Sequence, residues 1–196
     1  MKLEYIKRGA LEYALIRDLY SKGEVVKLKQ EIVALRRKAK VNSTGPAEDL
    51  LGRSLNYADS MWVDVEYEDR SKSNILTLNR KLFTSDISEQ LAKHSVYFSH
   101  IRHSTRDSTL LNFYTSGAEY KKHRDQSIFT ALTFFRFGDF TGGQLEFSDF
   151  DEWVEPEENT MVIFAGCIKH HAHKVNAESE HCFRASMAQF INYANI

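Results

Sequence analysis

Apolar residues recur every three or four positions between residues 25 and 40, which is the spacing of one face of an α-helix. Lysine and arginine gather at the end of this segment, where a helix C-terminus favours cations. The pattern predicts an amphipathic helix that ends before a loop at residues 42–46, the site of the Gly-Pro pair. Two further helices are predicted, over residues 4–20 and 86–93.

After about residue 95 the pattern changes to short runs rich in aromatic and β-branched residues, separated by turn residues such as Gly142 and Gly143. Seven or eight short strands favour a sandwich or jelly roll, which leaves few strand edges open. The predicted fold class is therefore mainly β with N-terminal helices, a jelly roll supported by helices. The predicted strands are residues 62–67, 109–115, 127–137, 144–147, 152–154, 160–164, 170–175 and 182–193.

The length of 196 residues predicts a single domain over residues 1–196, with a helical N-terminal support (1–50) and a β core (about 95–196). No apolar run approaches the length of a membrane helix, and the first residues lack an apolar signal core. We therefore expect an intracellular, cytoplasmic protein without a membrane partner. Cys167 and Cys182 are too few for a disulfide scaffold and are expected to be buried free thiols.

The formal net charge of −1 argues against a dedicated nucleic-acid binder, but the charges are unevenly distributed. Residues 1–40 hold eleven Lys and Arg against five Asp and Glu, whereas residues 139–158 hold eight acidic residues and no Lys or Arg. Two solvated faces of opposite sign explain this pattern. The alternative is that the acidic stretch forms a wall selecting a cationic substrate.

Five of the eight histidines lie after residue 120. Within His123-Arg124-Asp125, the first and third residues of an extended segment point the same way and could offer an imidazole and a carboxylate to one metal ion. Alone, this tripeptide better fits a charged surface segment in which Asp125 pairs with a neighbouring cation. A second histidine group about fifty residues later could complete a two-histidine, one-carboxylate set suited to iron. Arg184 follows among small and apolar neighbours, where an arginine needs an anionic partner.

A series of short motifs runs in a defined order between about residues 108 and 193. They are residues 112–117 with Tyr120, 123–125, 130–135, 142–147, Pro156, 161–164, 173–175 and Arg184. Together they resemble the Fe(II)/2-oxoglutarate-dependent dioxygenases, and within them the prolyl 4-hydroxylase-like branch.

This resemblance implies a distorted double-stranded β-helix that holds Fe(II) through His123, Asp125 and His173. Three protein ligands leave the other face of the metal open for co-substrate and dioxygen. His171 shares a strand face with His173 and is the alternative third ligand, whereas His170 is expected to point the other way.

The resemblance also implies that 2-oxoglutarate places its distal carboxylate against Arg184, whose planar fork suits a buried carboxylate. Ser186, on the same side of the strand, and Tyr114 are candidates for further hydrogen bonds to the co-substrate. Phe134 stands where some prolyl hydroxylases have a tyrosine. Phe190 stands where nucleic-acid demethylases of the superfamily have a second arginine, so nucleic acid is a disfavoured partner.

The function implied is that of an Fe(II)- and 2-oxoglutarate-dependent hydroxylase that uses dioxygen, releases succinate and CO2, and acts on a peptidyl proline. Ascorbate is a candidate accessory cofactor. A hydroxylase of a free amino acid or another small molecule is one alternative. A jelly-roll module that binds a metal or ligand without turnover is another.

Overall fold

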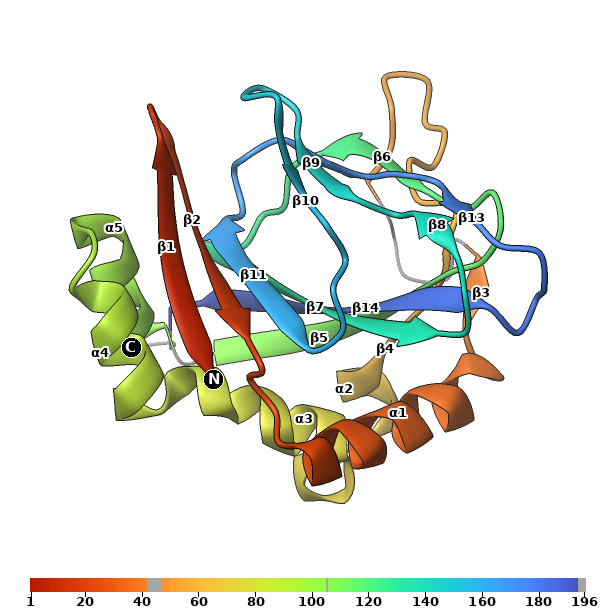
Figure 1. Cartoon of the computed structure of the whole chain (residues 1–196), viewed down its shortest axis with the longest axis horizontal. Helices are drawn as coiled ribbons and strands as arrows, with labels where there is room; N and C mark the ends of the chain where they lie inside the picture. The colour runs from red at the N-terminus through yellow and green to blue at the C-terminus, as the bar shows by residue number, and fades with distance from the viewer. Residues whose placement is uncertain (42–46, 105, 194–196) are drawn as a thin grey trace.

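The computed structural model describes residues 1–41, 47–104 and 106–193, and its strands form two facing antiparallel sheets and a short ribbon (Figure 1). The strands are β1 (Lys2–Arg8), β2 (Leu11–Arg17), β3 (Lys40–Val41), β4 (Asp59–Trp62), β5 (Arg106–Tyr114), β6 (Tyr120–His123), β7 (Phe129–Phe137), β8 (Thr141–Gly142), β9 (Leu145–Phe147), β10 (Glu152–Val154), β11 (Thr160–Ala165), β12 (His170–Ala172), β13 (Val175–Asn176) and β14 (Phe183–Asn192). The larger sheet has the order β1-β2-β11-β7-β14-β5-β4-β3 and the smaller has the order β10-β9-β12-β6. The short ribbon pairs β13 with β8. This architecture confirms the predicted fold class.

Helices cover the outer face of the larger sheet (Figure 1). They are α1 (Lys22–Arg36), α2 (Val63–Glu66), α3 (Asn74–Asn79), α4 (Ser85–Ala92) and α5 (Val96–Ser99), with 3-10 turns η1 (Arg70–Lys72), η2 (Arg80–Phe83) and η3 (His100–His103). Helix α1 confirms the amphipathic prediction, since its apolar stripe of Leu28, Ile32 and Leu35 is buried. Ser21 begins it through a capping box with Glu24, which satisfies backbone donors at the helix start.

Strand β14 lies in the middle of the larger sheet and separates two environments. Alternate residues of a strand point to opposite faces. Accordingly Ala185 and Met187 pack with the helices, whereas Arg184, Ser186 and Ala188 face the space between the two sheets. This alternation sets the functional arginine and serine on the inner face of the fold.

The predicted N-terminal helix over residues 4–20 is wrong, because this segment forms the hairpin of β1 and β2. Gly9 makes the turn with a φ of +60°, a conformation that favours glycine. Strand β2 pairs with β11, so the hairpin extends the larger sheet. Five of the seven residues of β2 are buried. Burial on both faces removed the period-two alternation that marks a half-buried strand.

Several smaller predictions can also be compared with the structure. Of residues 62–67, predicted as a strand, only Trp62 lies in a strand, at the end of β4, and Val63–Glu66 form α2. The helix predicted over residues 86–93 is confirmed as α4. The predicted loop at 42–46 lies outside the described residues. Cys167 is exposed and Cys182 half-buried, so the thiols are free as expected but not buried.

Within the part of the chain that the structure describes, no helix is both long enough and apolar enough to span a membrane.

Candidate functional site

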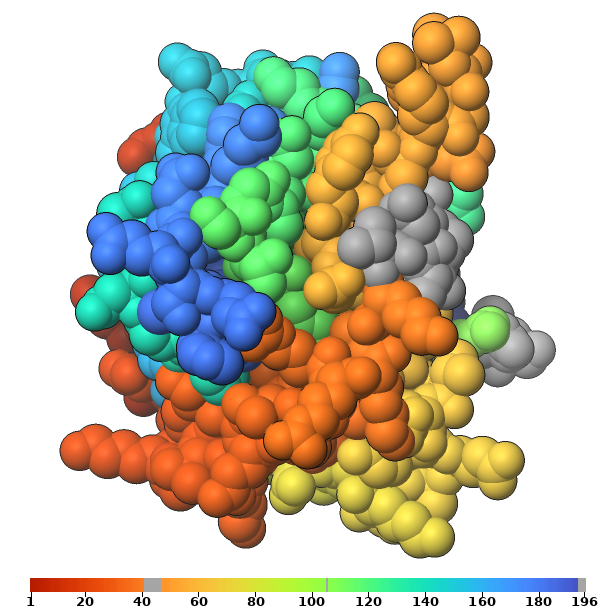
Figure 2. Space-filling model, turned by 90° about the vertical axis from the view of Figure 1, so that its right-hand side faces the viewer, coloured from red at the N-terminus to blue at the C-terminus, as the bar shows by residue number. Residues whose placement is uncertain are grey.

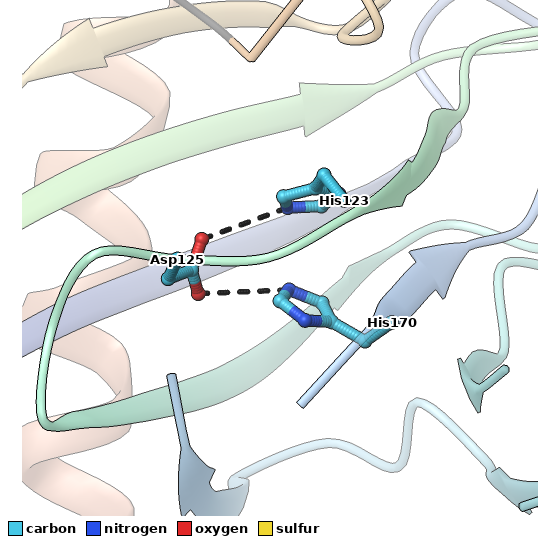
Figure 3. A group of neighbouring side chains, drawn as sticks. All are labelled: His123, Asp125 and His170. Carbon is cyan, nitrogen blue, oxygen red and sulfur yellow. Dashed lines mark ion pairs between the residues drawn. The ribbon is translucent and has the colours of Figure 1, made fainter. Parts of the chain in front are cut away.

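Three side chains converge between the two sheets, namely His123, Asp125 and His170 (Figure 3). His123 ends β6 and Asp125 follows two residues later, while His170 begins β12 directly opposite His123. The Nε2 atom of His123 lies 3.7 Å from Asp125 Oδ1, and that of His170 lies 3.6 Å from Asp125 Oδ2. Both histidines are almost fully buried. The cross-strand pairing therefore brings together two imidazoles and one carboxylate.

Backbone carbonyl groups determine which ring nitrogen of each imidazole carries the proton. His123 Nδ1 lies 2.7 Å from the Lys121 carbonyl and His170 Nδ1 lies 2.9 Å from the Ile168 carbonyl. A carbonyl only accepts hydrogen bonds, so each Nδ1 carries the proton and each Nε2 presents a lone pair. Burial lowers the pKa of His123 to about 3 and that of His170 to about 4, so both rings are neutral at neutral pH.

Asp125 presents its carboxylate to these lone pairs. Burial raises its pKa, while the neighbouring His123 and a hydrogen bond from Thr130 Oγ1, 2.5 Å from Oδ2, act in the opposite direction. Neither Nε2 lone pair can donate to the carboxylate, and both separations exceed hydrogen-bond length. Three buried electron-pair donors thus face one another without a proton between them, an arrangement that a divalent cation satisfies. The donor set fits Fe(II).

The structure does not bring His173, the predicted third ligand, to this centre. Its Nε2 lies 2.6 Å from Glu146 Oε2, in a separate group that also contains His171. The reason is the face of the sheet to which each residue of β12 points. His170 and Ala172 face the interior of the fold, so the strand turns His171 to the outside. Ala172 was the sequence signal for this, because the apolar residue of an alternating strand marks its buried face.

Arg184 is 1% exposed and lies in the cavity beside the three converging side chains. Its Nη1 donates to the Gly143 carbonyl, and its guanidinium stacks 3.9 Å from the Tyr114 ring. Its Nε is buried without a hydrogen-bond partner, and no carboxylate of the described residues pairs with it. A buried cation in this state calls for an anionic ligand. The predicted role of Arg184 toward a carboxylate therefore fits its surroundings.

The other two residues predicted to bind the co-substrate also line this cavity. Ser186 lies next to Arg184 on the inner face of β14, and Tyr114 lies on the neighbouring strand β5. Burial raises the pKa of Tyr114, so its phenol keeps its proton and can donate. The remaining wall is largely apolar. The cavity is lined by Leu110, Asn112, Tyr114, Tyr120, His123, Asp125, Leu132, Phe134, Leu145, His170, Ala172, Arg184, Ser186, Ala188 and Phe190.

Gly142 and Gly143 hold the turn that meets Arg184. Gly142 has a φ of +75°, and a Cβ there would collide with the Lys174 carbonyl oxygen. We expect Gly142→Ala to lower the free energy of unfolding by about 2–4 kcal/mol, because both the conformation and the space exclude a side chain. Urea unfolding followed by circular dichroism measures this change.

Gly23 provides the matched control for that substitution. It lies in the first turn of α1, and a Cβ there would meet no atom within 4 Å. Gly23→Ala is expected to raise the free energy of unfolding by about 0.5–1 kcal/mol, since alanine is the better helix former. Equal effects of the two substitutions would contradict the role given to Gly142.

A more open cleft continues from the cavity toward the surface, and the two share Leu110, Tyr120, Asp125 and Phe190. The segment after residue 46 forms one side of this cleft. Two backbone hydrogen bonds hold it against the start of β6. The Tyr57 N–H donates to the Glu119 carbonyl, and the Lys121 N–H donates to the Leu55 carbonyl. Figure 2 shows this segment, in orange, beside the green surface of the chain that leads into β6. The cleft is lined by Ala47, Asn56, Trp62, Ser108, Leu110, Tyr120, Arg124, Asp125, Gln126, Ser127, Phe190 and Asn192.

Two residues besides His170 support the centre, and neither was predicted from the sequence to contact it. Thr130 orients Asp125 through its hydroxyl, and Tyr120 stacks on His123 with ring centroids 3.6 Å apart. Tyr120 lies within the motif preceding His123, three residues before it, but its stacking depends on a strand that ends at His123. No spacing rule applied to the sequence would have shown the contact.

Residues 109–192 match the sequence model described as the 2OG-Fe(II) oxygenase superfamily. This range contains His123, Asp125, His170 and Arg184. A comparison with curated proteins finds no match.

Solved structures share the fold at low sequence identity. A Pseudomonas putida prolyl-4-hydroxylase has a TM-score of 0.65 and 14% identity, with 95% of each chain covered. A viral collagen prolyl hydroxylase from Paramecium Bursaria Chlorella virus-1, solved as a 2OG complex, has a TM-score of 0.57 and 14% identity, covering 93% of this chain and 96% of the other. A Trichoplax adhaerens prolyl hydroxylase, in complex with a hypoxia inducible factor peptide fragment, has a TM-score of 0.62 and 12% identity over 92% and 83%.

Proposed function

We propose that the chain is a member of the 2OG-Fe(II) oxygenase superfamily, whose sequence model matches residues 109–192, and that it is a hydroxylase acting on a peptidyl proline. The convergence of His123, Asp125 and His170 beside Arg184, which has no carboxylate partner among the described residues, carries the proposal. These groups provide a metal-binding face and an anion-binding residue within one cavity. Both are needed by an enzyme that couples oxidation of its substrate to decarboxylation of 2-oxoglutarate.

His123, Asp125 and His170 would hold Fe(II) in this proposal. When bound, the metal supplies activation of dioxygen for substrate oxidation. The protein fixes the donors in advance, since the Lys121 and Ile168 carbonyls hold the imidazole tautomers and Thr130 fixes the carboxylate. The burial of His123 and His170 limits the contact of the two imidazoles with bulk water.

Arg184, Tyr114 and Ser186 would bind 2-oxoglutarate. The guanidinium would take the distal carboxylate through charge-assisted hydrogen bonds, using the Nε donor that has no partner in the described structure. Phe134 supports the position of the guanidinium, which lies 5.6 Å from its ring. Release of succinate and CO2 follows from this assignment, and ascorbate would be the accessory reductant for sustained turnover.

The substrate would enter by the cleft that opens beside Asp125. Trp62 and Phe190 stand in its wall with ring centroids 5.6 Å apart, and they offer an apolar surface to a pyrrolidine ring. Gln126 and Asn192 add amide groups that can hydrogen-bond a peptide backbone. The open shape of the cleft suits a chain that continues beyond the reacting residue. The fold likeness to prolyl hydroxylases is consistent with this substrate class.

The proposed function predicts a visible absorption band when metal-free protein is titrated anaerobically, first with Fe(II) and then with 2-oxoglutarate. Admission of dioxygen with a proline-containing peptide should then yield succinate and hydroxyproline in equal amounts. Free proline serves as the matched substrate control. Peptide turnover at a much higher kcat/KM than free proline is expected.

Other outcomes separate the alternatives. Efficient turnover of free proline or another small molecule would replace the peptide assignment while keeping the reaction class. Metal binding by a folded protein, without the band and without succinate formation, would indicate a jelly-roll module that binds its ligand without turnover.

A further inference from the structure

We propose that Glu146, His171 and His173 form a second metal site on the outer face of the smaller sheet, with Zn²⁺ as the best-suited ion. The site is separate from the centre between the sheets, because β9 and β12 place its residues on the opposite face. His170 pairs with Phe147 toward the interior, whereas the next pair, His171 and Glu146, faces outward. The potential ligand atoms of the three side chains all lie within 4.8 Å of one another.

The protonation of His171 supports this assignment. Its Nε2 lies 3.2 Å from Glu119 Oε2, and an ionised carboxylate only accepts hydrogen bonds. Nε2 therefore carries the proton and Nδ1 presents a lone pair. This Nδ1 is buried, has no hydrogen-bond partner in the described structure, and faces Glu146 Oε2 at 3.6 Å. A histidine oriented by a carboxylate on its far nitrogen is the usual arrangement of a zinc-binding imidazole.

Glu146 and His173 complete the donor set. His173 Nε2 lies 2.6 Å from Glu146 Oε2, and the Trp153 ring packs 4.4 Å from the His173 ring. Lys122 pairs with the other carboxylate oxygen, Oε1, at 3.1 Å. Oε2 is therefore the atom that both imidazoles share, and a cation placed there would replace the proton between His173 and Glu146.

The spacing of these atoms suits a small ion. Ligands about 2.0–2.1 Å from a tetrahedral Zn²⁺ lie about 3.4 Å apart, and the two measured imidazole-to-carboxylate separations of 2.6 and 3.6 Å fall on either side of that value. Imidazole nitrogens favour Zn²⁺ and its neighbours in the first transition row over the oxygen-seeking Ca²⁺ and Mg²⁺. Lys122 and Lys174 offset the charges of Glu146 and Glu119. The choice of ion therefore rests on the donor atoms rather than on net charge.

The test begins from a His123→Ala/Asp125→Ala variant, in which the inner centre has lost two of its three donors. Isothermal titration calorimetry with Zn²⁺ alone should show one Zn²⁺ ion bound per molecule of this variant. Adding His173→Ala should weaken the affinity by about 100-fold or more, and adding Glu119→Gln, which removes the orienting charge, should weaken it by about tenfold. His181→Ala is the matched control, since this exposed histidine lies outside the group and its loss should leave the affinity unchanged.

Trp153 offers an independent readout. Co²⁺ bound at His173 should quench the fluorescence of Trp153, and Trp153→Phe should remove that response while Zn²⁺ binding remains. If the starting variant fails to fold, wild-type protein gives the same test. Two equivalents of Co²⁺ are then expected, falling to one in His173→Ala. A folded protein whose Zn²⁺ affinity is the same with and without His173, or one that binds no ion outside the inner centre, would overturn the proposal.

Discussion

His170→Ala is expected to abolish the absorption band that Fe(II) and 2-oxoglutarate form together, whereas His173→Ala is expected to retain it. The His170 imidazole lies beside Asp125 in the cavity that also contains Arg184, while His173 lies on the far side of the sheet. Loss of one of three protein ligands should weaken Fe(II) binding by more than about 100-fold. Substitution of residues that only hydrogen-bond to metal ligands already lowers metal affinity by about 10–100-fold. Anaerobic titration followed by visible spectroscopy measures the difference.

His170 also packs against His123 and Phe164, so its removal needs a control for folding. Near-ultraviolet circular dichroism of the His170→Ala variant should match that of the wild type. His171→Ala, one residue along the same strand, is the matched substitution and should keep the band. A band lost in His173→Ala but retained in His170→Ala would restore the ligand set predicted from the sequence and refute the one drawn from the structure.

The difference between these two histidines shows where the sequence stops determining the site. His123 and Asp125 could be proposed together because they are two residues apart in one extended segment. The third ligand comes from another strand, and its identity depends on register. His170 lies opposite His123, and the register shifts between His170 and Ala172. Such an irregularity leaves no mark in the spacing of residues, and a shift of one position reverses which side chains face the interior.

The fold was predictable to the extent that each element had a pattern of its own. Helix α1 could be predicted because one stripe of a surface helix is buried and the rest is polar. The hairpin of β1 and β2 was missed because burial of β2 depends on its pairing with β11, more than 140 residues later in the chain. Residues 62–67 carry aromatic and β-branched side chains, yet α2 forms there, since tertiary contacts override weak local preference.

Arg184 could be predicted for a different reason. Its neighbours along β14 are small or apolar, so the sequence alone indicated a buried cation in need of an anion. What the sequence could not supply is the surrounding structure, in which Gly143 reaches the guanidinium from the loop between β8 and β9 and Tyr114 stacks on it from β5. These contacts fix the direction of the guanidinium while its Nε keeps no partner in the described structure.

Arg184→Met is accordingly expected to raise the KM for 2-oxoglutarate by about 30-fold or more, because a buried charge-assisted pair contributes about 2–5 kcal/mol to binding. Fe(II) affinity should change little, since Arg184 is not among the three converging donors. The free protein should be as stable as the wild type or more stable, because methionine fills similar space and removes a buried cation that has no counter-ion in the described part of the chain. Steady-state kinetics and urea unfolding measure the two effects on one variant.

Arg136→Met is the matched control for this substitution. Arg136 is the cross-strand neighbour of Arg184 on β7, stacks 3.8 Å from the Phe140 ring and donates to the Phe140 carbonyl, but it lies outside the cavity. Its loss should leave the KM for 2-oxoglutarate unchanged. A folded Arg184→Met variant with wild-type KM would remove Arg184 from co-substrate binding. A variant that gains stability while losing 2-oxoglutarate would show that the arginine is kept for its ligand at the expense of the fold.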